Sequence, residues 1–302
     1  MNAPPPHIGI DLGGTKTEII ALDPHGKTLL RERRPTPAHD YGAILDTIAA
    51  LIENAERRLG ARASVGIGTP GALSPASGLL RNSNTQCLNG KTLKQDLETH
   101  LERPVRLAND ANCFALSEAT DGAAAGASVV FGVIVGTGTG GGIVVDGRVL
   151  NGPNAIAGEW GHNPLPWPRA EELPGPACYC GRHGCIETWL SGPGLRRDHL
   201  ASSGERLDPA QIAARAPDKA ASAATLSRYI DRMARALAQV INLLDPDVIV
   251  LGGGIGNIDA LYREVPQRWG QWIFSDVVST RLLRPLHGDS SGVRGAAWLW
   301  RD

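Results

Sequence analysis

The sequence predicts two α/β domains, each built on a sheet with glycine loops at its strand ends. The chain has 302 residues, which is enough for two hydrophobic cores of ordinary size. The order strand, glycine loop, strand, turn, strand occurs in HIGIDLGGTKTEIIALDPHGKTLL (7–30) and again in SVVFGVIVGTGTGGGIVVDGRVL (128–150). This repeat indicates an internal duplication, with one copy in each domain.

The remaining elements follow from hydrophobic spacing and turn residues. Apolar residues at helical spacing predict a helix over 41–59, and SVGIGTPG (64–71) indicates a buried strand that ends in a loop. The other expected elements are a helix in 91–103, a strand over 105–110 that runs into a helix over 111–126, a helix over 226–244 followed by a strand and a glycine turn in DPDVIVLGGGIG (245–256), and a packed terminal helix.

Composition excludes several classes of protein. The formal net charge is −1 at pH 7, so no basic excess exists to neutralise the phosphates of a nucleic acid or an acidic membrane surface. No apolar run is long enough for a membrane span, and the N-terminus lacks the charged and apolar regions of a signal peptide. We therefore expect a cytoplasmic protein with reduced thiols, no nucleic-acid partner and no membrane partner.

Three glycine clusters each follow a strand-like run, at 11–16, 136–142 and 252–256. Any one of them could be a tight turn, but backbone N–H groups freed of side chains can also cradle phosphates. Three clusters, two of them at matching points of a repeat, favour a nucleotide. The sequence has no GxxxxGK[ST] motif, and the GxGxxG at Gly136, Gly138 and Gly141 leads into a strand pattern, whereas a dinucleotide fingerprint opens a helix.

CYCGRHGC places Cys178, Cys180 and Cys185 within eight residues. Three thiols cannot all pair as disulfides, and C-x-C-x₄-C supplies three of the four ligands of a structural zinc site. His162, His183 and His199 are the nearby candidates for the fourth ligand.

Asp110 lies at the end of the strand pattern RLAND, before a helix. The structural alternative for Asn109 and Asp110 is that they cap this helix, a position that both residue types favour. A carboxylate at a strand end can also accept the proton of an attacking hydroxyl.

Taken together, DLGGTK (11–16), AND (108–110), GEWGH (158–162) and CYCGRHGCIE (178–187) resemble the ROK family of bacterial sugar kinases. The resemblance runs from Ile8 to the C-terminus. It implies two ribonuclease-H-like domains of the actin, hsp70 and sugar-kinase superfamily, flanking an ATP and sugar cleft. We expect the first domain at 1–118 and the second at 119–288, with a zinc loop at 158–187 and a helix at 289–302 that packs back on the first domain.

The resemblance also implies roles for individual residues. Asp110 would be the general base, and His162 would complete the zinc site with Cys178, Cys180 and Cys185. Asp11 would hold Mg²⁺, directly or through water. The expected sugar ligands are Gly71, Asn84, Asn109, Asp110, Glu159, His162 and Glu187, and the expected ATP ligands are Asp11, Gly13, Gly14, Thr15, Lys16, Thr137, Gly138, Gly253 and Gly254.

Within the family, RNSNTQCLNG (81–90), DGAAAGA (121–127), GEWGHNPLPW (158–167) and HGDSSGVRGAAWLW (287–300) are most similar to fructokinases that also accept mannose. We therefore expect phosphorylation of D-fructose at its 6-hydroxyl, with ATP, Mg²⁺ and a structural Zn²⁺. A glucokinase or N-acetylglucosamine kinase of the same family is the alternative with the same chemistry. A non-catalytic, zinc-stapled sugar-binding or regulatory protein is the alternative of another class. We also expect a homodimer.

Overall fold

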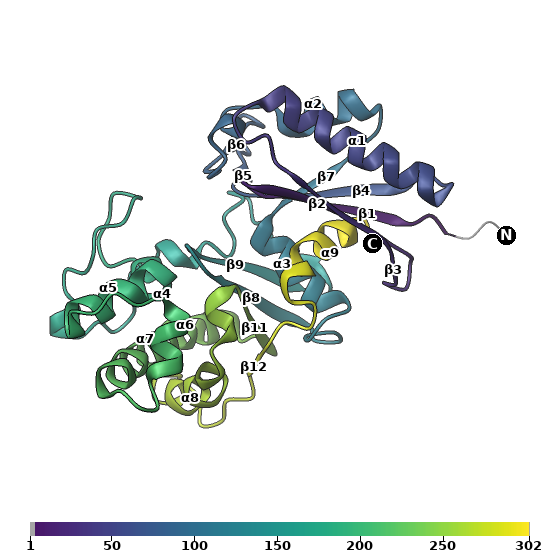
Figure 1. The fold of residues 1–302 in the computed structure, drawn as a ribbon. Coiled ribbons are helices and arrows are strands. Elements are labelled where there is room, and N and C mark those ends of the chain that lie inside the picture. The colour runs from purple at the N-terminus through teal and green to yellow at the C-terminus, as the bar shows by residue number, and fades with distance from the viewer. Residues whose placement is uncertain (1–3, 302) are drawn as a thin grey trace. The chain divides into compact units, whose positions relative to one another are not determined.

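The structure is a computed structural model that describes residues 4–301. The chain forms two compact units, which we describe one at a time (Figure 1). Unit 1 consists of residues 1–126, 142–157 and 286–302, and unit 2 of residues 127–141 and 158–285. These limits differ from the ranges 1–118 and 119–288 because a second stretch, 142–157, belongs to unit 1. The expected domain ranges 1–118 and 119–288 stay a prediction.

The first sheet lies in unit 1 and has the strand order β3-β2-β1-β4-β7. β1 pairs antiparallel with β2 and parallel with β4, and β4 pairs parallel with β7. These strands are β1 (His7–Leu12), β2 (Lys16–Leu22), β3 (Thr28–Pro35), β4 (Ser64–Thr69) and β7 (Arg106–Asn109). The strands expected at the start of the chain are therefore confirmed.

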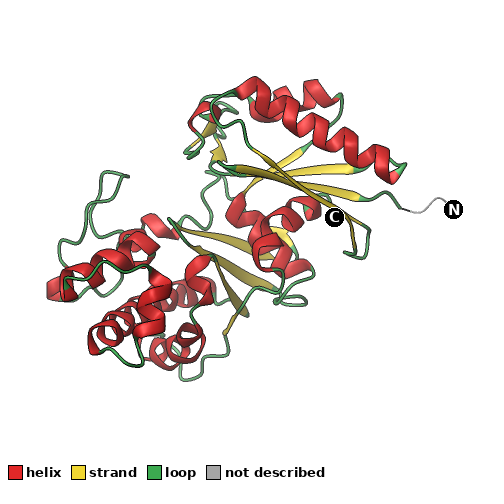
Figure 2. Ribbon diagram, in the orientation of Figure 1, coloured by secondary structure: helices red, strands yellow, loops and turns green. Residues whose placement is uncertain are grey.

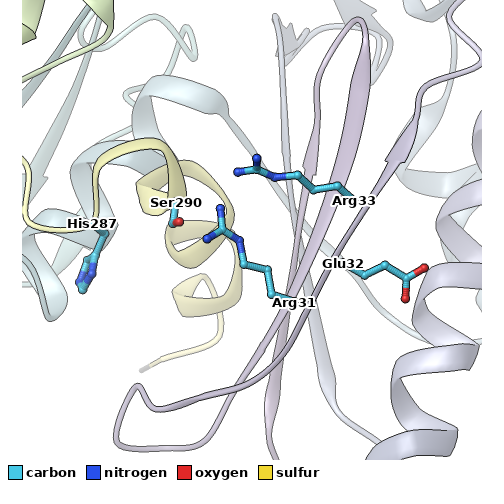
Figure 3. Close-up of a pocket in the computed structure, with 5 residues that line it drawn as sticks. All are labelled: Arg31, Glu32, Arg33, His287 and Ser290. Carbon is cyan, nitrogen blue, oxygen red and sulfur yellow. The ribbon is translucent and has the colours of Figure 1, made fainter.

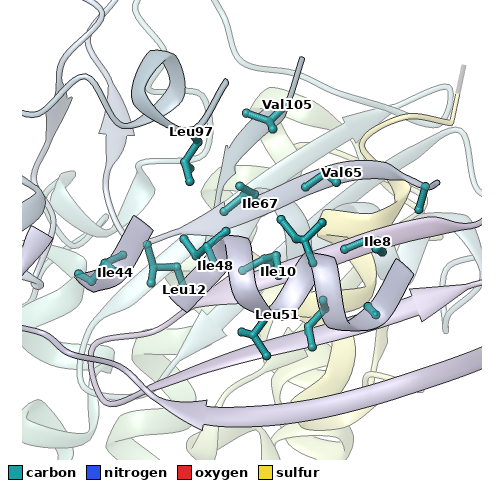
Figure 4. Close-up of a cluster of buried hydrophobic side chains, with 14 of the residues drawn as sticks. Ile8, Ile10, Leu12, Ile44, Ile48, Leu51, Val65, Ile67, Leu97 and Val105 are labelled. Carbon is teal, nitrogen blue, oxygen red and sulfur yellow. The ribbon is translucent and has the colours of Figure 1, made fainter. Parts of the chain in front are cut away.

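One face of this sheet carries the hydrophobic core of unit 1 (Figure 4). In β1 the alternate residues Ile8, Ile10 and Leu12 are fully buried among apolar side chains of two helices, α1 (Tyr41–Leu59) and α2 (Leu93–Leu101). The bounds of α1 agree with the predicted helix. Asp40 caps its N-terminus by accepting a hydrogen bond from Ala43 N, and Gly60 ends it in the left-handed conformation.

The other face of the sheet is covered by α9 (Ser291–Trp298), which also packs on α3 (Asp110–Thr120). Glycines make this contact possible. A Cβ atom on Gly9 would lie 2.1 Å from Val293 O, and one on Gly66 would lie 1.9 Å from Ala296 O. Backbone therefore rests directly on backbone here, and no larger residue fits. The helix predicted over 111–126 ends earlier than expected, because residues 121–126 leave the helix as a turn.

The second sheet repeats the order of the first when strands are counted along the chain, because its order is β10-β9-β8-β11-β12. β8 pairs parallel with β11, and β11 pairs parallel with β12. The limit between the two units falls within β9. These strands are β8 (Val129–Val135), β9 (Thr139–Val145), β10 (Arg148–Val149), β11 (Val248–Gly252) and β12 (Arg281–Leu283).

The α-helices of unit 2 follow Cys185 along the chain, and Figure 2 shows them in red. The helices are α4 (Ile186–Leu190), α5 (Gly192–Ser203), α6 (Pro209–Arg215), α7 (Ala220–Leu244) and α8 (Asp259–Trp269). The short elements of the chain are β5 (Ala72–Leu73), β6 (Leu80–Arg81), and the 3-10 turns η1 (Gln86–Leu88), η2 (Trp160–His162), η3 (Ala170–Glu172), η4 (Gly254–Asn257), η5 (Gly270–Trp272) and η6 (Gly288–Ser290). Among the helices within residues 4–301, none is both long and apolar enough to cross a membrane.

A buried ion-pair cluster fastens the segment that precedes the cysteines to α7. Arg235 is fully buried and donates to the carboxylate of Glu172 and to the backbone oxygens of Pro166 and Trp167. Arg232 donates to the same carboxylate over 2.8 Å. Burial raises the pKa of Glu172, but hydrogen bonds from Arg235, from Arg169 N and from Arg232 outweigh it and lower this pKa to about 2.

We predict that Glu172→Gln lowers the free energy of unfolding by about 3 kcal/mol at pH 7, because the buried Arg232 and Arg235 lose the carboxylate that they share. The pKa of Glu172 lies below its ordinary value of 4.5 in the folded state. Its contribution is therefore fully present above pH 4.5 and fades as the pH falls towards about 2. Urea unfolding at several pH values measures both effects, and the exposed Glu171→Gln is the control. Equal stability of the two variants at pH 7 would contradict the prediction.

Candidate functional site

The first glycine loop joins β1 to β2 in unit 1. Gly13 N donates to Lys16 O over 3.0 Å, and a Cβ atom on Gly13 would lie 2.8 Å from that same oxygen. A Cβ atom on Gly14 would lie 3.3 Å from Thr85 Oγ1 and 3.9 Å from Asn84 Oδ1. The fold thus brings residues 84 and 85 to the loop that is expected to bind phosphate, and the two glycines of this turn carry no side chain of their own.

Asp11 is the last residue but one of β1, beside this loop. Its burial, the negative charge of Asp110 and that of Glu18 raise the pKa of the Asp11 carboxyl to about 6, while Lys16 and Arg33 act in the opposite direction. Asp11 and Asp110 come from different elements, β1 and α3, and are close enough to repel each other. A divalent cation would relieve this repulsion, since carboxylate oxygens are the ligands that Mg²⁺ prefers. The donor set therefore fits Mg²⁺.

Glu18 lies opposite Asp11 in the β1–β2 register and is almost fully buried. Its two carboxylate oxygens accept hydrogen bonds from Arg31 Nε and Arg33 Nε, the second over 2.6 Å. In Figure 3 both guanidinium groups point towards Ser290, and with it they line a cavity of about 660 Å³ in unit 1. Glu18 could not be selected from its sequence context, because a lone glutamate in a strand forms no motif.

Asn109 and Asp110 stand at the junction of β7 and α3. Asn109 is the N-cap: its Oδ1 accepts a hydrogen bond from Ala111 N, and its Nδ2 donates to Gly71 O over 3.1 Å. Asp110 Oδ1 also accepts from Ala111 N, over 2.8 Å. Capping is therefore confirmed for Asn109. The hydrogen bond from Ala111 N fixes the Asp110 carboxylate at the start of α3, close to Asp11. Gly71 has φ +83°, and a Cβ atom there would lie 2.3 Å from Arg81 O.

In unit 2 the structure brings His162 together with Cys178, Cys180 and Cys185, and their ligand atoms all lie within 4.8 Å of one another. Cys178 Sγ is 3.5 Å from His162 Nδ1, and Cys180 Sγ is 3.6 Å from Cys185 Sγ. Ligands about 2.3 Å from a tetrahedral zinc ion would be about 3.8 Å apart. These four side chains therefore fit zinc in number, chemistry and spacing.

The two other candidate histidines lie elsewhere. His183 takes part in a backbone bridge with Ala177. His199 is buried on α5, with its Nδ1 3.0 Å from Thr225 Oγ1. Neither belongs to the cluster that the described residues form.

The surroundings of the cluster match what a metal ligand needs. His162 Nε2 is 2.8 Å from Tyr179 Oη, so the ring nitrogen that faces away from the cysteines has a partner of its own. Burial and the neighbouring thiols raise the pKa of Cys185 to about 12, a cost that a bound cation would offset by stabilising the thiolate. Burial, followed by the charges of Glu187, of the cluster cysteines and of Glu159, raises the pKa of Tyr179 to about 12.

The second glycine loop, 136–142, leads into strand β9, so the rejection of the dinucleotide fingerprint is confirmed. Glu187, at the start of α4, accepts a hydrogen bond from Thr139 N over 2.9 Å. The loop thus lies against one of the carboxylates expected to bind sugar. Glu159 directly precedes η2, so it and His162 are held on one short turn.

The third glycine cluster follows β11. Gly253 has φ +81°, and a Cβ atom there would lie 2.4 Å from Val135 O, so the β11 turn packs directly on β8. Gly254 lines a cavity of about 700 Å³ in unit 2, together with small residues of α6 and polar residues of α8. A cavity with an apolar wall and a polar edge suits a purine base and its ribose.

The expected residues therefore fall into two groups, one in each unit. Unit 1 holds Asp11, Gly13, Gly14, Thr15, Lys16, Gly71, Asn84, Asn109 and Asp110; unit 2 holds Thr137, Gly138, Glu159, His162, Cys178, Cys180, Cys185, Glu187, Gly253 and Gly254.

Comparison with known proteins places the chain among sugar kinases by similarity. It is 40% identical to an N-acetyl-D-glucosamine kinase of Photobacterium profundum over 298 residues, which cover 97% of this chain and 98% of that protein. The crystal structure of a ROK hexokinase from Thermus thermophilus superposes with a TM-score of 0.86 at 32% identity, covering 97% of this chain and 96% of that one.

A third similar protein is a ROK family glucokinase from Streptomyces griseus, solved in complex with glucose and AMPPNP. It has a TM-score of 0.75 at 25% identity, covering 97% of this chain and 98% of that one. The sequence profile of the ROK family matches residues 7–302, and the chain belongs to that family.

Proposed function

We propose that this protein transfers the γ-phosphoryl group of Mg·ATP to the 6-hydroxyl of a free hexose. The observation that carries the proposal is the pairing of Asp110 and Asp11 beside the glycine turn of unit 1. One carboxylate would accept the proton of the attacking hydroxyl while the other holds the magnesium ion. Magnesium would draw charge from the transferring phosphoryl group.

N-acetyl-D-glucosamine is the hexose that we propose as the preferred substrate. Its support is the 40% identity to a protein of that name over nearly the whole chain. The fructose preference expected from the sequence is not confirmed by the relatives, which are named for N-acetylglucosamine, glucose or hexose. Fructose, with mannose, remains the alternative.

The remaining contacts have proposed roles that follow from their chemistry. The side-chain amide of Asn109, oriented by its hydrogen bond to Gly71 O, would bind sugar hydroxyls. The carboxylates of Glu159 and Glu187 would accept hydrogen bonds from other sugar hydroxyls. Gly13 to Lys16, with Thr137 and Gly138, supply amides, hydroxyls and an ammonium group to the phosphates. Gly254, which lines the unit 2 cavity, and its neighbour Gly253 would face the adenosine.

Zinc would have a structural role in this scheme. A His-Cys₃ set leaves no open coordination position, so the ion would fix the loop and would not activate water. It would tie Glu159 and Glu187, three and two residues from ligands, to one rigid segment.

The substrate proposal predicts that kcat/KM is highest for N-acetyl-D-glucosamine among that sugar, glucose, mannose and fructose. ADP release with Mg·ATP, measured by a coupled assay, tests it. A highest value on fructose would keep the mechanism and reverse the choice of substrate.

Asp110→Asn is expected to lower kcat by about 10²- to 10⁴-fold, because the amide cannot accept the proton of the hexose hydroxyl. Hexose binding, measured by calorimetry, should stay within a few-fold of wild type. Asp46→Asn, on the exposed surface of α1, is the matched control. Wild-type protein that binds hexose but shows no turnover would favour the non-catalytic sugar-binding alternative.

Zinc should be present at one ion per chain and should be lost in Cys180→Ser. The KM for the hexose should then rise about tenfold or more, because the two glutamates lose their common anchor. Mass spectrometry of the metal content, with parallel kinetics, gives both readings. Cys87→Ser, outside the cluster, should retain the ion. Full activity of a zinc-free variant would refute the scaffolding role.

A further inference from the structure

The glycine loop at residues 136–140, which we call the phosphate loop, has few side chains that restrict its backbone, and only its last two residues belong to β9. Three of its five residues are glycine, and glycine loses more conformational freedom on folding than any other residue. Within the loop, Gly136 N donates to Gly138 O over 2.9 Å. The other contacts that fix it come from outside the loop.

Three hydrogen bonds reach the phosphate loop from two segments that flank zinc ligands. Trp160 Nε1 donates to Gly140 O over 3.0 Å, and Thr139 N donates to Glu187 Oε2 over 2.9 Å. Gly192 N donates to Gly136 O over 2.7 Å. All these residues belong to unit 2.

The same segments also touch the loop by close packing. A Cβ atom on Gly161 would lie 2.1 Å from Thr139 O, and one on Gly138 would lie 2.7 Å from Glu187 Oε2. Trp160 is 5% exposed, and its ring contacts Phe131 of β8 edge-on, with the ring centroids 5.5 Å apart. The indole is therefore fixed, and its N–H has one place to donate.

These contacts connect the zinc cluster to the loop by short covalent paths. Trp160 is two residues before His162, and Glu187 is two residues after Cys185. An ion that joins His162 to Cys185 would hold Trp160 and Glu187 at a set distance from each other. Trp160 donates a hydrogen bond to the loop, and Glu187 accepts one from it.

We propose that Trp160 is a positioning residue for the nucleotide. Its indole N–H donates to Gly140 O and so fixes the conformation of the phosphate loop relative to the segment that contains the zinc ligand His162. This inference rests on the proposed function, since it takes the loop to bind ATP. Zinc then supports nucleotide binding as well as hexose binding. Core packing of Trp160 alone would give no reason for a selective effect on the nucleotide.

The test compares Trp160→Phe with Trp272→Phe. Phenylalanine keeps a ring against Phe131 but leaves the Gly140 carbonyl without its donor. Trp272 is a suitable control because its indole nitrogen has no hydrogen-bond partner among the described residues. We expect Trp160→Phe to raise the KM for ATP and the Kd of a fluorescent ATP analogue about fivefold, with zinc content unchanged and a smaller change in the KM for the hexose.

Each other outcome has a defined meaning. If wild type is active and the two variants have the same KM for ATP and the same Kd for the ATP analogue, the positioning role is overturned. The proposed function is then left intact. An equal rise in both KM values would also overturn it. Wild-type protein that neither binds the ATP analogue nor turns over would refute the proposed function and, with it, this inference.

Hydrogen exchange provides a second measurement that needs no variant. Amides of residues 136–142 in wild-type protein should exchange faster after zinc is extracted, while those of β11, remote in sequence from the cluster, should change less. Unchanged exchange in the loop would overturn the link between zinc and the nucleotide loop, even if Trp160→Phe fails to fold.

Discussion

The arrangement of unit 1 depends on direct contact between backbones that glycine permits. A Cβ atom at Gly295 would lie 1.6 Å from Cys113 O, so α9 crosses α3 with no side chain between them. Gly9 and Gly66 bring α9 equally close to the first sheet. Side chains of β1 alternate between faces, so Asp11 shares the Gly9 face, the one that α9 covers. The start of α3, which carries Asp110, is thereby held beside Asp11. The burial of Asp11 and its repulsion by Asp110, which raise the pKa of Asp11, are consequences of this packing.

In unit 2, hydrogen bonds from side chains and backbone position the second glycine loop. This loop leads into strand β9, so no helix continues from it. The loop instead takes hydrogen bonds from Trp160 and Gly192 and gives one to Glu187. A His-Cys₃ cluster lies within two residues of both Trp160 and Glu187. A bound zinc ion would in this way hold Trp160 and Glu187 in place within a segment that is poor in regular structure.

Elements that depend on residues close together in the sequence could be predicted from the sequence. The period of α1 and the repeated strand-loop-strand units needed only hydrophobic spacing and glycine positions. The zinc ligands were limited to three cysteines and three histidines by spacing. The choice of His162 came from the family resemblance, and its closeness to the cysteines depends on how 163–177 folds back. Glu18 and Trp160 were beyond reach, because register and long-range hydrogen bonds decide their partners. The helix end at Thr120 also depends on tertiary contacts, since Glu118 accepts hydrogen bonds from Ala123 N and Leu286 N.

The contact between α9 and β1 also bears on the order in which the chain can fold. A polypeptide emerging from the ribosome presents β1 early, but the helix that covers the Gly9 and Gly66 face follows all of unit 2 in the sequence. Until α9 is synthesised, the Gly9 and Gly66 face of the first sheet has no helix to cover it, whereas residues 158–285 can already pack among themselves. Unit 1 can therefore be completed only after unit 2 has been synthesised. The surroundings of Asp11 and Asp110 depend in this way on a helix that is far from them in the sequence.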